Sequence, residues 1–141
     1  DLDSKEYTQL AAQCLSICET YGIQLVLHTH IQSALDLGVT AIHLPLPILK
    51  QESKRLNAFT MIGTSVHAVE EVALAQNSGA TYLIAGHIFQ TDCKADLKPR
   101  GISFYQKVQN ASHIPVYPIG GIHTDTPQEI IHAGATDFCI M

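Results

Sequence analysis

The chain has 141 residues, of which 46% are hydrophobic and 15% are charged, and its formal net charge is −5. A negative balance without a basic patch gives no general reason to bind nucleic acid or an anionic membrane. No apolar run reaches the roughly 20 residues of a membrane span, and the polar amino terminus lacks the pattern of a secretory signal. We therefore expect a cytoplasmic protein. None of its four cysteines forms a C-x-x-C pair, so we expect buried or free thiols.

Helical and extended patterns alternate along the chain. The first helix is predicted over residues 4–21, and Gly22 ends it before a strand over residues 23–27. Further strands are predicted over residues 41–44, 60–63, 81–85, 115–119 and 137–141, with helices over residues 31–37, 47–56, 68–78, 102–110 and 126–133. Three helices end in a similar phrase, in which a glycine caps the helix before the next strand: Gly38-Val-Thr, Gly79-Ala-Thr and Gly134-Ala-Thr. This regular alternation predicts repeated βα units.

Strands that alternate with single helices form a parallel sheet covered by helices, as a doubly wound sheet or as a barrel. A doubly wound sheet normally has a glycine-rich loop after its first strand, but here that strand leads into His28-Thr29-His30 and no G-x-G-x-x-G occurs. A TIM barrel places its phosphate site late in the chain, which suits Ile119-Gly120-Gly121-Ile122. A full barrel needs roughly 200 or more residues. We therefore expect an α/β fold, a (β/α)8 TIM barrel that lacks its first two strands and last helix, with residues 1–141 as a single partial domain.

The candidate site lies where the strand over residues 81–85 ends. It runs directly into Gly86 and His87, and the polar loop that follows carries Thr91 and Lys94. A histidine with a pKa near 6.5 is the side chain best suited to take and return a proton at neutral pH. Thr91 and Lys94 could bind an anionic group nearby. The loop therefore predicts a proton-transfer residue beside a phosphate or carboxylate contact.

Three segments resemble, in order and spacing, the thiamin phosphate synthase and TenI superfamily of TIM barrels. They are Gly63-Thr-Ser-Val-His67, Gly86-His-Ile-Phe-Gln-Thr-Asp-Cys-Lys94 and Pro118-Ile-Gly-Gly-Ile122. The first and third are common to both branches of the superfamily. The second is similar to the loop of TenI-type thiazole tautomerases, because synthases usually have Gly-Pro-Ile-Phe-x-Thr-x-x-Lys there. By this resemblance His87 matches the catalytic histidine of the tautomerases.

The resemblance also shows where the chain departs from the synthases. A synthase binds magnesium diphosphate through carboxylates in an Asn-Asp-x segment and a Gly-Gln-Glu-Asp-like segment. This chain has His28-Thr29-His30 and Pro45-Leu46-Pro47-Ile48 at those places. Because Mg²⁺ prefers oxygen ligands, we expect no metal site, and no cofactor is predicted.

The resemblance thus implies a thiazole tautomerase, an isomerase that aromatises a carboxythiazole phosphate tautomer in thiamin biosynthesis. His87 would move the proton, since a positioned acid/base group contributes typically about 10²- to 10⁴-fold. The substrate is a small-molecule thiazole phosphate, and the residues expected to bind it are Ser65, Thr91, Lys94, Gly120 and Gly121. The alternatives are a thiamin phosphate synthase and a non-catalytic TenI-like regulatory or ligand-binding domain. A homodimer is a further expectation, because an exposed barrel edge favours self-association.

Other polar residues have simpler interpretations. His67 ends a strand and is common to both branches, so it is expected to support the structure or contact a shared substrate group. His28 and His30 could point from one face of a strand as metal ligands, but no third ligand has suitable spacing. Ser65 lacks the G-x-S-x-G context of a nucleophile. His43 is expected to be an ordinary strand histidine with satisfied hydrogen bonds.

Overall fold

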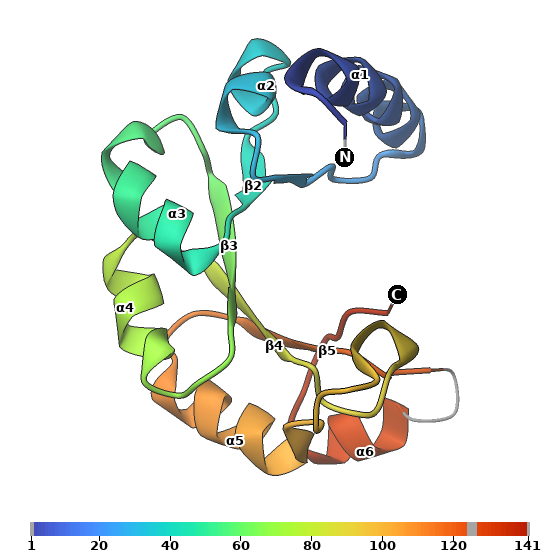
Figure 1. The fold of residues 1–141 in the computed structure, drawn as a ribbon, viewed down its shortest axis with the longest axis vertical. Helices are drawn as coiled ribbons and strands as arrows, with labels where there is room; N and C mark the ends of the chain where they lie inside the picture. Colours follow the sequence, from blue (N-terminus) through green and yellow to red (C-terminus); the bar gives the residue numbers. More distant parts are fainter. Residues whose placement is uncertain (1, 124–126, 141) are drawn as a thin grey trace.

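The computed structural model describes residues 2–123 and 127–140, and these form a five-stranded parallel sheet with helices between the strands. The strands follow one another in the order β1-β2-β3-β4-β5. Figure 1 shows the strands and helices as an open arc, with α3, α4 and α5 on its outer side. The strands are β1 (Leu27–His28), β2 (Ala41–His43), β3 (Met61–Val66), β4 (Tyr82–Gly86) and β5 (Val116–Ile119). The helices are α1 (Ser4–Tyr21), α2 (Ile31–Asp36), α3 (Leu46–Glu52), α4 (Glu71–Asn77), α5 (Gly101–Ala111) and α6 (Pro127–His132), with 3₁₀ turns η1 (Ser53–Arg55) and η2 (Asp92–Lys94). The α/β fold with a parallel sheet is confirmed.

The first helix begins and ends where local chemistry requires it. Asp3 accepts hydrogen bonds from the backbone N–H groups of Lys5 and Glu6, and the Glu6 carboxylate accepts one from Asp3 N–H in return. This capping box satisfies donors that the helix itself leaves free. Gly22 ends the helix with φ 64°, a left-handed conformation that glycine adopts without strain. The predicted limits of this helix, residues 4–21, are confirmed.

Two predicted strands differ at the edges of the sheet. The strand expected over residues 23–27 is reduced to β1, which pairs only with β2. At the other edge, the segment expected to form a strand over residues 137–140 makes one isolated bridge, between Cys139 and Ile119; residue 141 lies outside the described residues. By contrast, β3 extends to Val66, because the residues after Gly63 pair with Leu83, Ile84 and Ala85 of β4. The length of each strand therefore depends on the partner strand beside it as well as on the apolar pattern.

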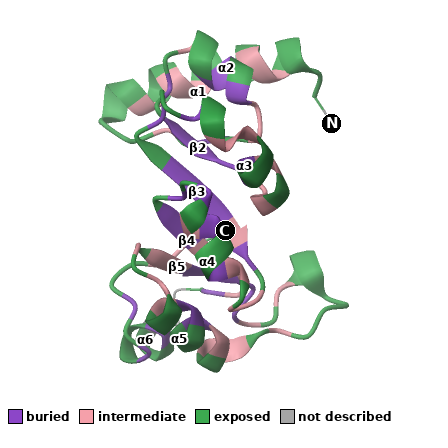
Figure 2. Cartoon of the chain, turned by 90° about the vertical axis from the view of Figure 1, so that its left-hand side faces the viewer, coloured by how far each residue is buried: buried purple, intermediate pink, exposed green. Residues whose placement is uncertain are grey.

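The core lies between the sheet and its helices. Figure 2 shows buried residues concentrated in β2, β3 and β4. The fully buried aliphatic side chains come from strands and helices alike, and they include Ile42, Leu44, Leu49, Val66, Val72 and Leu83. Each such side chain contributes roughly 1.5–3 kcal/mol on burial. The predicted helix-ending glycines Gly38, Gly79 and Gly134 have φ 67°, 97° and 96°, so they do provide the left-handed turn before the next strand.

Parallel pairing places the carboxyl ends of the strands at one edge. His43 at the end of β2 pairs with Gly63 within β3, and Gly63 pairs with Tyr82 at the start of β4, so each of these strands ends further along the sheet than the one before it. Gly86 pairs with Ile119 at the end of β4 and β5. The loops that follow these strands therefore meet. No helix among the described residues is long and apolar enough to cross a membrane.

Candidate active site

Five of the predicted site residues line one cavity at the carboxyl edge of the sheet. This cavity, which we call the loop pocket, has a volume of about 400 Å³. The predicted residues that line it are Ser65, His87, Thr91, Lys94 and Gly120, and its other lining residues are His28, His43, Ile84, Cys93 and Ile119. Gly121 follows Gly120 directly but is not part of the lining. Residues from β3, β4 and the loops after β4 and β5 thus converge as the parallel topology predicts.

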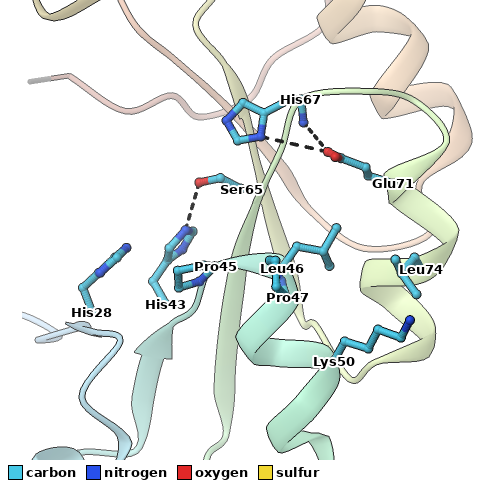
Figure 3. A pocket seen from close by; sticks show the side chains of 10 residues that line it. All are labelled: His28, His43, Pro45, Leu46, Pro47, Lys50, Ser65, His67, Glu71 and Leu74. Atoms are coloured by element: carbon cyan, nitrogen blue, oxygen red, sulfur yellow. Dashed lines mark hydrogen bonds and ion pairs between the residues drawn. The ribbon is translucent and has the colours of Figure 1, made fainter.

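A second cavity adjoins the first. This helix pocket has a volume of about 570 Å³ and shares His28, His43 and Ser65 with the loop pocket. Its other lining residues come from α3, from α4 and from the segments before them, and they are Pro45, Leu46, Pro47, Lys50, His67, Glu71 and Leu74 (Figure 3). Each pocket is therefore lined by one lysine, Lys94 in the first and Lys50 in the second.

His43 lies at the boundary of the two pockets and is buried. Its Nε2 is 3.0 Å from Ser65 Oγ, a contact drawn in Figure 3, and its Nδ1 is 3.2 Å from the Tyr82 hydroxyl. Burial, with a smaller effect of the neighbouring His28, lowers the pKa of His43 to about 4. The imidazole is therefore neutral at physiological pH. The sequence predicted an ordinary strand histidine here, and it did not predict that His43 connects Ser65 in the pockets with Tyr82.

His87 anchors the loop that follows β4. The side chain is only 5% exposed, and its Nε2 is 3.2 Å from the carbonyl oxygen of Leu97. A carbonyl only accepts hydrogen bonds, so Nε2 carries a hydrogen and donates it. The backbone N–H of Arg100 donates to the His87 carbonyl at 3.0 Å. His87 thus ties both ends of the loop that carries Lys94, while its predicted role in proton transfer stays a prediction.

Positive groups gather around His67. Its backbone N–H donates to the Glu71 carboxylate at 2.6 Å, and its Nδ1 is 4.0 Å from the same oxygen. Burial lowers the pKa of His67; Glu71 opposes this effect, whereas Lys94, Arg100 and His87 add to it. Burial is the main cause of the lowering, and the basic side chains of the loop after β4 contribute less. Sequence reasoning missed Arg100, which stands outside the resembling segments.

The two glycines after β5 are required by the loop after β4. Gly120 and Gly121 have φ 96° and 66°, and a Cβ on Gly120 would overlap His87, while one on Gly121 would overlap the backbone of Phe89 and Gln90. The Phe89 N–H donates to the Gly120 carbonyl at 3.0 Å. The predicted contact of the two glycines with a phosphate stays a prediction.

The carboxyl ends of β1 and β2 do not fit a magnesium site built on carboxylates. His28 Nδ1 is 2.7 Å from Thr29 Oγ1, whereas the His30 ring stacks on Tyr7 at 3.9 Å. The two histidines therefore do not share one face of a strand, because β1 ends at His28 and His30 precedes α2. Over residues 2–123 and 127–140, no group of three or more His, Cys, Asp or Glu is placed to hold a metal ion. All four cysteines are free thiols.

Known proteins resemble this chain along its whole length. It is 33% identical to the thiamine-phosphate synthase of Shouchella clausii over 97% of the chain and 67% of that protein. It is 28% identical to the thiamine-phosphate synthase of Clostridium acetobutylicum over 100% of the chain and 68% of that protein. The thiamine phosphate pyrophosphorylase of Pyrococcus furiosus shares its fold with a TM-score of 0.86 and 24% identity, covering 99% of the chain and 68% of that protein. The chain spans about two thirds of these relatives.

The expected thiazole tautomerase, and with it the isomerase class, is wrong. These relatives are named thiamine-phosphate synthase, which was the alternative, and none of them is named a tautomerase. The error has a specific origin. The sequence interpretation separated the two branches mainly by one loop, where His87 stands in place of a proline. In the structure this histidine is buried against Leu97 and supports the loop, so its presence does not require tautomerase chemistry.

The family assignment rests on more of the chain than that loop. A family model described as thiamine monophosphate synthase matches residues 1–141. The segments that carry the resemblance lie at the carboxyl ends of β3, β4 and β5, and each contributes residues to the lining of the loop pocket. The chain therefore belongs to the thiamine monophosphate synthase family.

Proposed function

We propose that the chain forms the larger part of a transferase that makes thiamine phosphate, and that its loop pocket binds a phosphorylated substrate. The observation that carries this proposal is the convergence of Lys94, Ser65, Thr91 and Gly120 on one cavity. Cationic side chains and backbone N–H groups are the usual ligands of phosphate oxygens. The names of the relatives supply the reaction class.

Thiamine phosphate contains a pyrimidine joined through a methylene group to a phosphorylated thiazole. A pyrophosphorylase that makes it forms the bond between the thiazole nitrogen and this methylene carbon. The carbon–oxygen bond to the diphosphate breaks, and pyrophosphate leaves with that electron pair. The two substrates thus each carry phosphate. Two adjoining pockets, lined by Lys94 and Lys50 respectively, fit this requirement.

The protein's own residues have defined tasks in this proposal. Lys94 and Lys50 balance phosphate charge, and Ser65 lies between the two pockets to contact either substrate. Thr91 is a second hydroxyl for the phosphate or the thiazole. The ends of β1 and β2 offer no carboxylates for Mg²⁺, so no step is assigned to a metal there. We also propose that the five-stranded arc is part of a TIM barrel; a homodimer stays a prediction.

The test is a direct assay of the full-length protein with a pyrimidine methyl diphosphate and a thiazole phosphate. Thiamine phosphate and pyrophosphate should appear in equal amounts. Each substrate alone should give neither product. If the protein bound the thiazole phosphate but formed no thiamine phosphate, with or without Mg²⁺, it would instead be a ligand-binding domain. The absence of carboxylates at the ends of β1 and β2 is the observation that keeps this second candidate.

A further inference from the structure

Tyr82, His43 and Ser65 form a continuous chain of hydrogen bonds that ends in the pockets. The Tyr82 hydroxyl is 3.2 Å from His43 Nδ1, and His43 Nε2 is 3.0 Å from Ser65 Oγ. The three residues belong to β4, β2 and β3, so the chain of bonds crosses three neighbouring strands. Tyr82 and His43 are each 9% exposed, and both His43 and Ser65 line the two pockets.

Gly63 makes this arrangement possible. It lies on β3 between His43 and Tyr82, which pair with it from the two sides. A Cβ at this position would overlap the Tyr82 ring and hydroxyl. Because glycine has no side chain, the phenol can lie across β3 and reach His43 on the strand beyond. The contact between Tyr82 and His43 across β3 thus explains why residue 63 is a glycine.

The hydrogen atoms in the hydrogen bonds between Tyr82, His43 and Ser65 can be assigned by counting donors and acceptors. Burial keeps His43 neutral, with a pKa of about 4, and raises the pKa of Tyr82 to about 12, so the imidazole has one N–H and the phenol keeps its hydrogen. Among the described residues, the only hydrogen-bond partner of the Tyr82 hydroxyl is His43 Nδ1. The phenol is satisfied as a donor only if it donates to Nδ1, because an Nδ1–H would leave the phenol hydrogen without an acceptor. Nε2 then carries the imidazole hydrogen and donates to Ser65 Oγ.

We infer that Tyr82 and His43 are positioning residues that make the Ser65 hydroxyl a hydrogen-bond donor to an anionic oxygen in the pockets. Because Ser65 Oγ accepts from His43, its own hydrogen is free to point into the cavity. If His43 held the opposite tautomer, Ser65 would donate to it and turn oxygen lone pairs toward the ligand, which repels a phosphate. The identity of the anion as a phosphorylated substrate rests on the proposed function. The assignment of the tautomer does not.

The tautomer can be measured directly in the full-length protein labelled with ¹⁵N-histidine. The His43 signals should show a protonated Nε2 and an unprotonated Nδ1 that accepts a hydrogen bond. In Tyr82→Phe this preference should be lost, because nothing then donates to Nδ1. Tyr117→Phe is the matched control: its ring packs edge-on against Tyr82 at 5.8 Å, outside the chain of bonds, so the His43 signals should be unchanged. A proton on Nδ1 in the unmodified protein, or an unchanged tautomer in Tyr82→Phe, would overturn the inference.

Binding of inorganic phosphate supplies the second readout. Ser65→Ala should weaken phosphate binding about ten-fold, and Tyr82→Phe by a similar or smaller factor, since each removes one charge-assisted hydrogen bond or its orientation. The double variant should bind no more weakly than Ser65→Ala, because Tyr82 acts only through Ser65. If the loss of phosphate affinity in the double variant equalled the product of the two single losses, the inference would be overturned. Ser65→Ala makes no demand on the core and keeps the test valid if Tyr82→Phe unfolds. If the His43 tautomer were as inferred but the protein formed no thiamine phosphate, only the proposed function would be contradicted.

Discussion

Arg100 Nε donates a hydrogen bond to the carbonyl oxygen of Gly86, 3.1 Å away, and so closes the loop after β4 back onto the strand from which it leaves. The backbone next to Arg100 also joins the end of the loop to its beginning, since Gly101 N–H donates to the Ile88 carbonyl at 3.0 Å. Together with the bond from His87 to Leu97, these contacts fix the segment that carries Thr91 and Lys94. The position of the predicted anion-binding residues therefore depends on hydrogen bonds made elsewhere in the same loop.

His87→Gln tests the anchoring role of the histidine. The loss of its bond to Leu97 should cost about 1 kcal/mol of local stability, seen as faster hydrogen exchange over residues 91–100. KM for the phosphorylated substrate should rise while kcat changes little. A fall in kcat of about 10²- to 10⁴-fold with a lost pH inflection would instead give His87 the proton-transfer role predicted from the sequence. His113→Gln, at an exposed position, should change neither quantity.

Gly63→Ala tests the close approach of Tyr82 to β3. The added methyl group overlaps the phenol ring, so the free energy of unfolding should fall by about 1–3 kcal/mol. Chemical denaturation measures this change. Combining Gly63→Ala with Tyr82→Leu should cost less than the sum of the two single changes, because the smaller side chain makes room. Strict additivity would show that the ring does not lie over Gly63.

The pKa of His43 predicts how stability depends on pH. In the folded protein the pKa of His43 is lowered to about 4, whereas in the unfolded chain the side chain takes up the proton near the ordinary histidine pKa of 6.5. Protonation therefore favours the unfolded state, and stability should fall as the pH drops from 6.5 to about 4, by at most about 1.4 kcal/mol per pH unit. His28, which stacks on His43 at 5.5 Å, and the Tyr82 hydroxyl are the titratable groups in contact with its ring.

Urea unfolding between pH 7 and pH 4 measures this dependence. His43→Gln should flatten the curve, because glutamine does not titrate. His67, whose pKa is also lowered, adds to the slope in the same direction and should leave a smaller residual dependence in that variant. If His43→Gln left the curve unchanged, His43 would not be the buried neutral base that the structure shows.

The sequence could predict what depends on local pattern and on parallel topology. The limits of α1 follow from Asp3 and Gly22, and the convergence of Ser65, Lys94 and Gly120 follows from their places after neighbouring parallel strands. The short length of β1 could not be predicted, because residues 23–26 have strand-like side chains but pair with no other strand among the described residues. The contact of Tyr82 with His43 could not be predicted either, since it depends on a ring crossing β3 at Gly63.

Single-residue arguments about function were less reliable than arguments about position. His87 was expected to be catalytic because of its residue type and its loop, and it does line the loop pocket. Its hydrogen bond to Leu97 gives the same residue a structural task. A difference at one residue of this loop therefore could not decide between the two activities.

The most direct measurement of the central claim is a calorimetric titration of the full-length protein with a thiazole phosphate. Lys94→Met should weaken binding roughly five- to ten-fold, because it removes a positive charge from the loop pocket. Lys107→Met is the matched control, because Lys107 is exposed on α5 and lines neither pocket. The affinity of this variant for the thiazole phosphate should stay within about two-fold of that of the unmodified protein. Equal affinities for all three proteins, or no binding by the unmodified one, would contradict a phosphate site at this edge of the sheet.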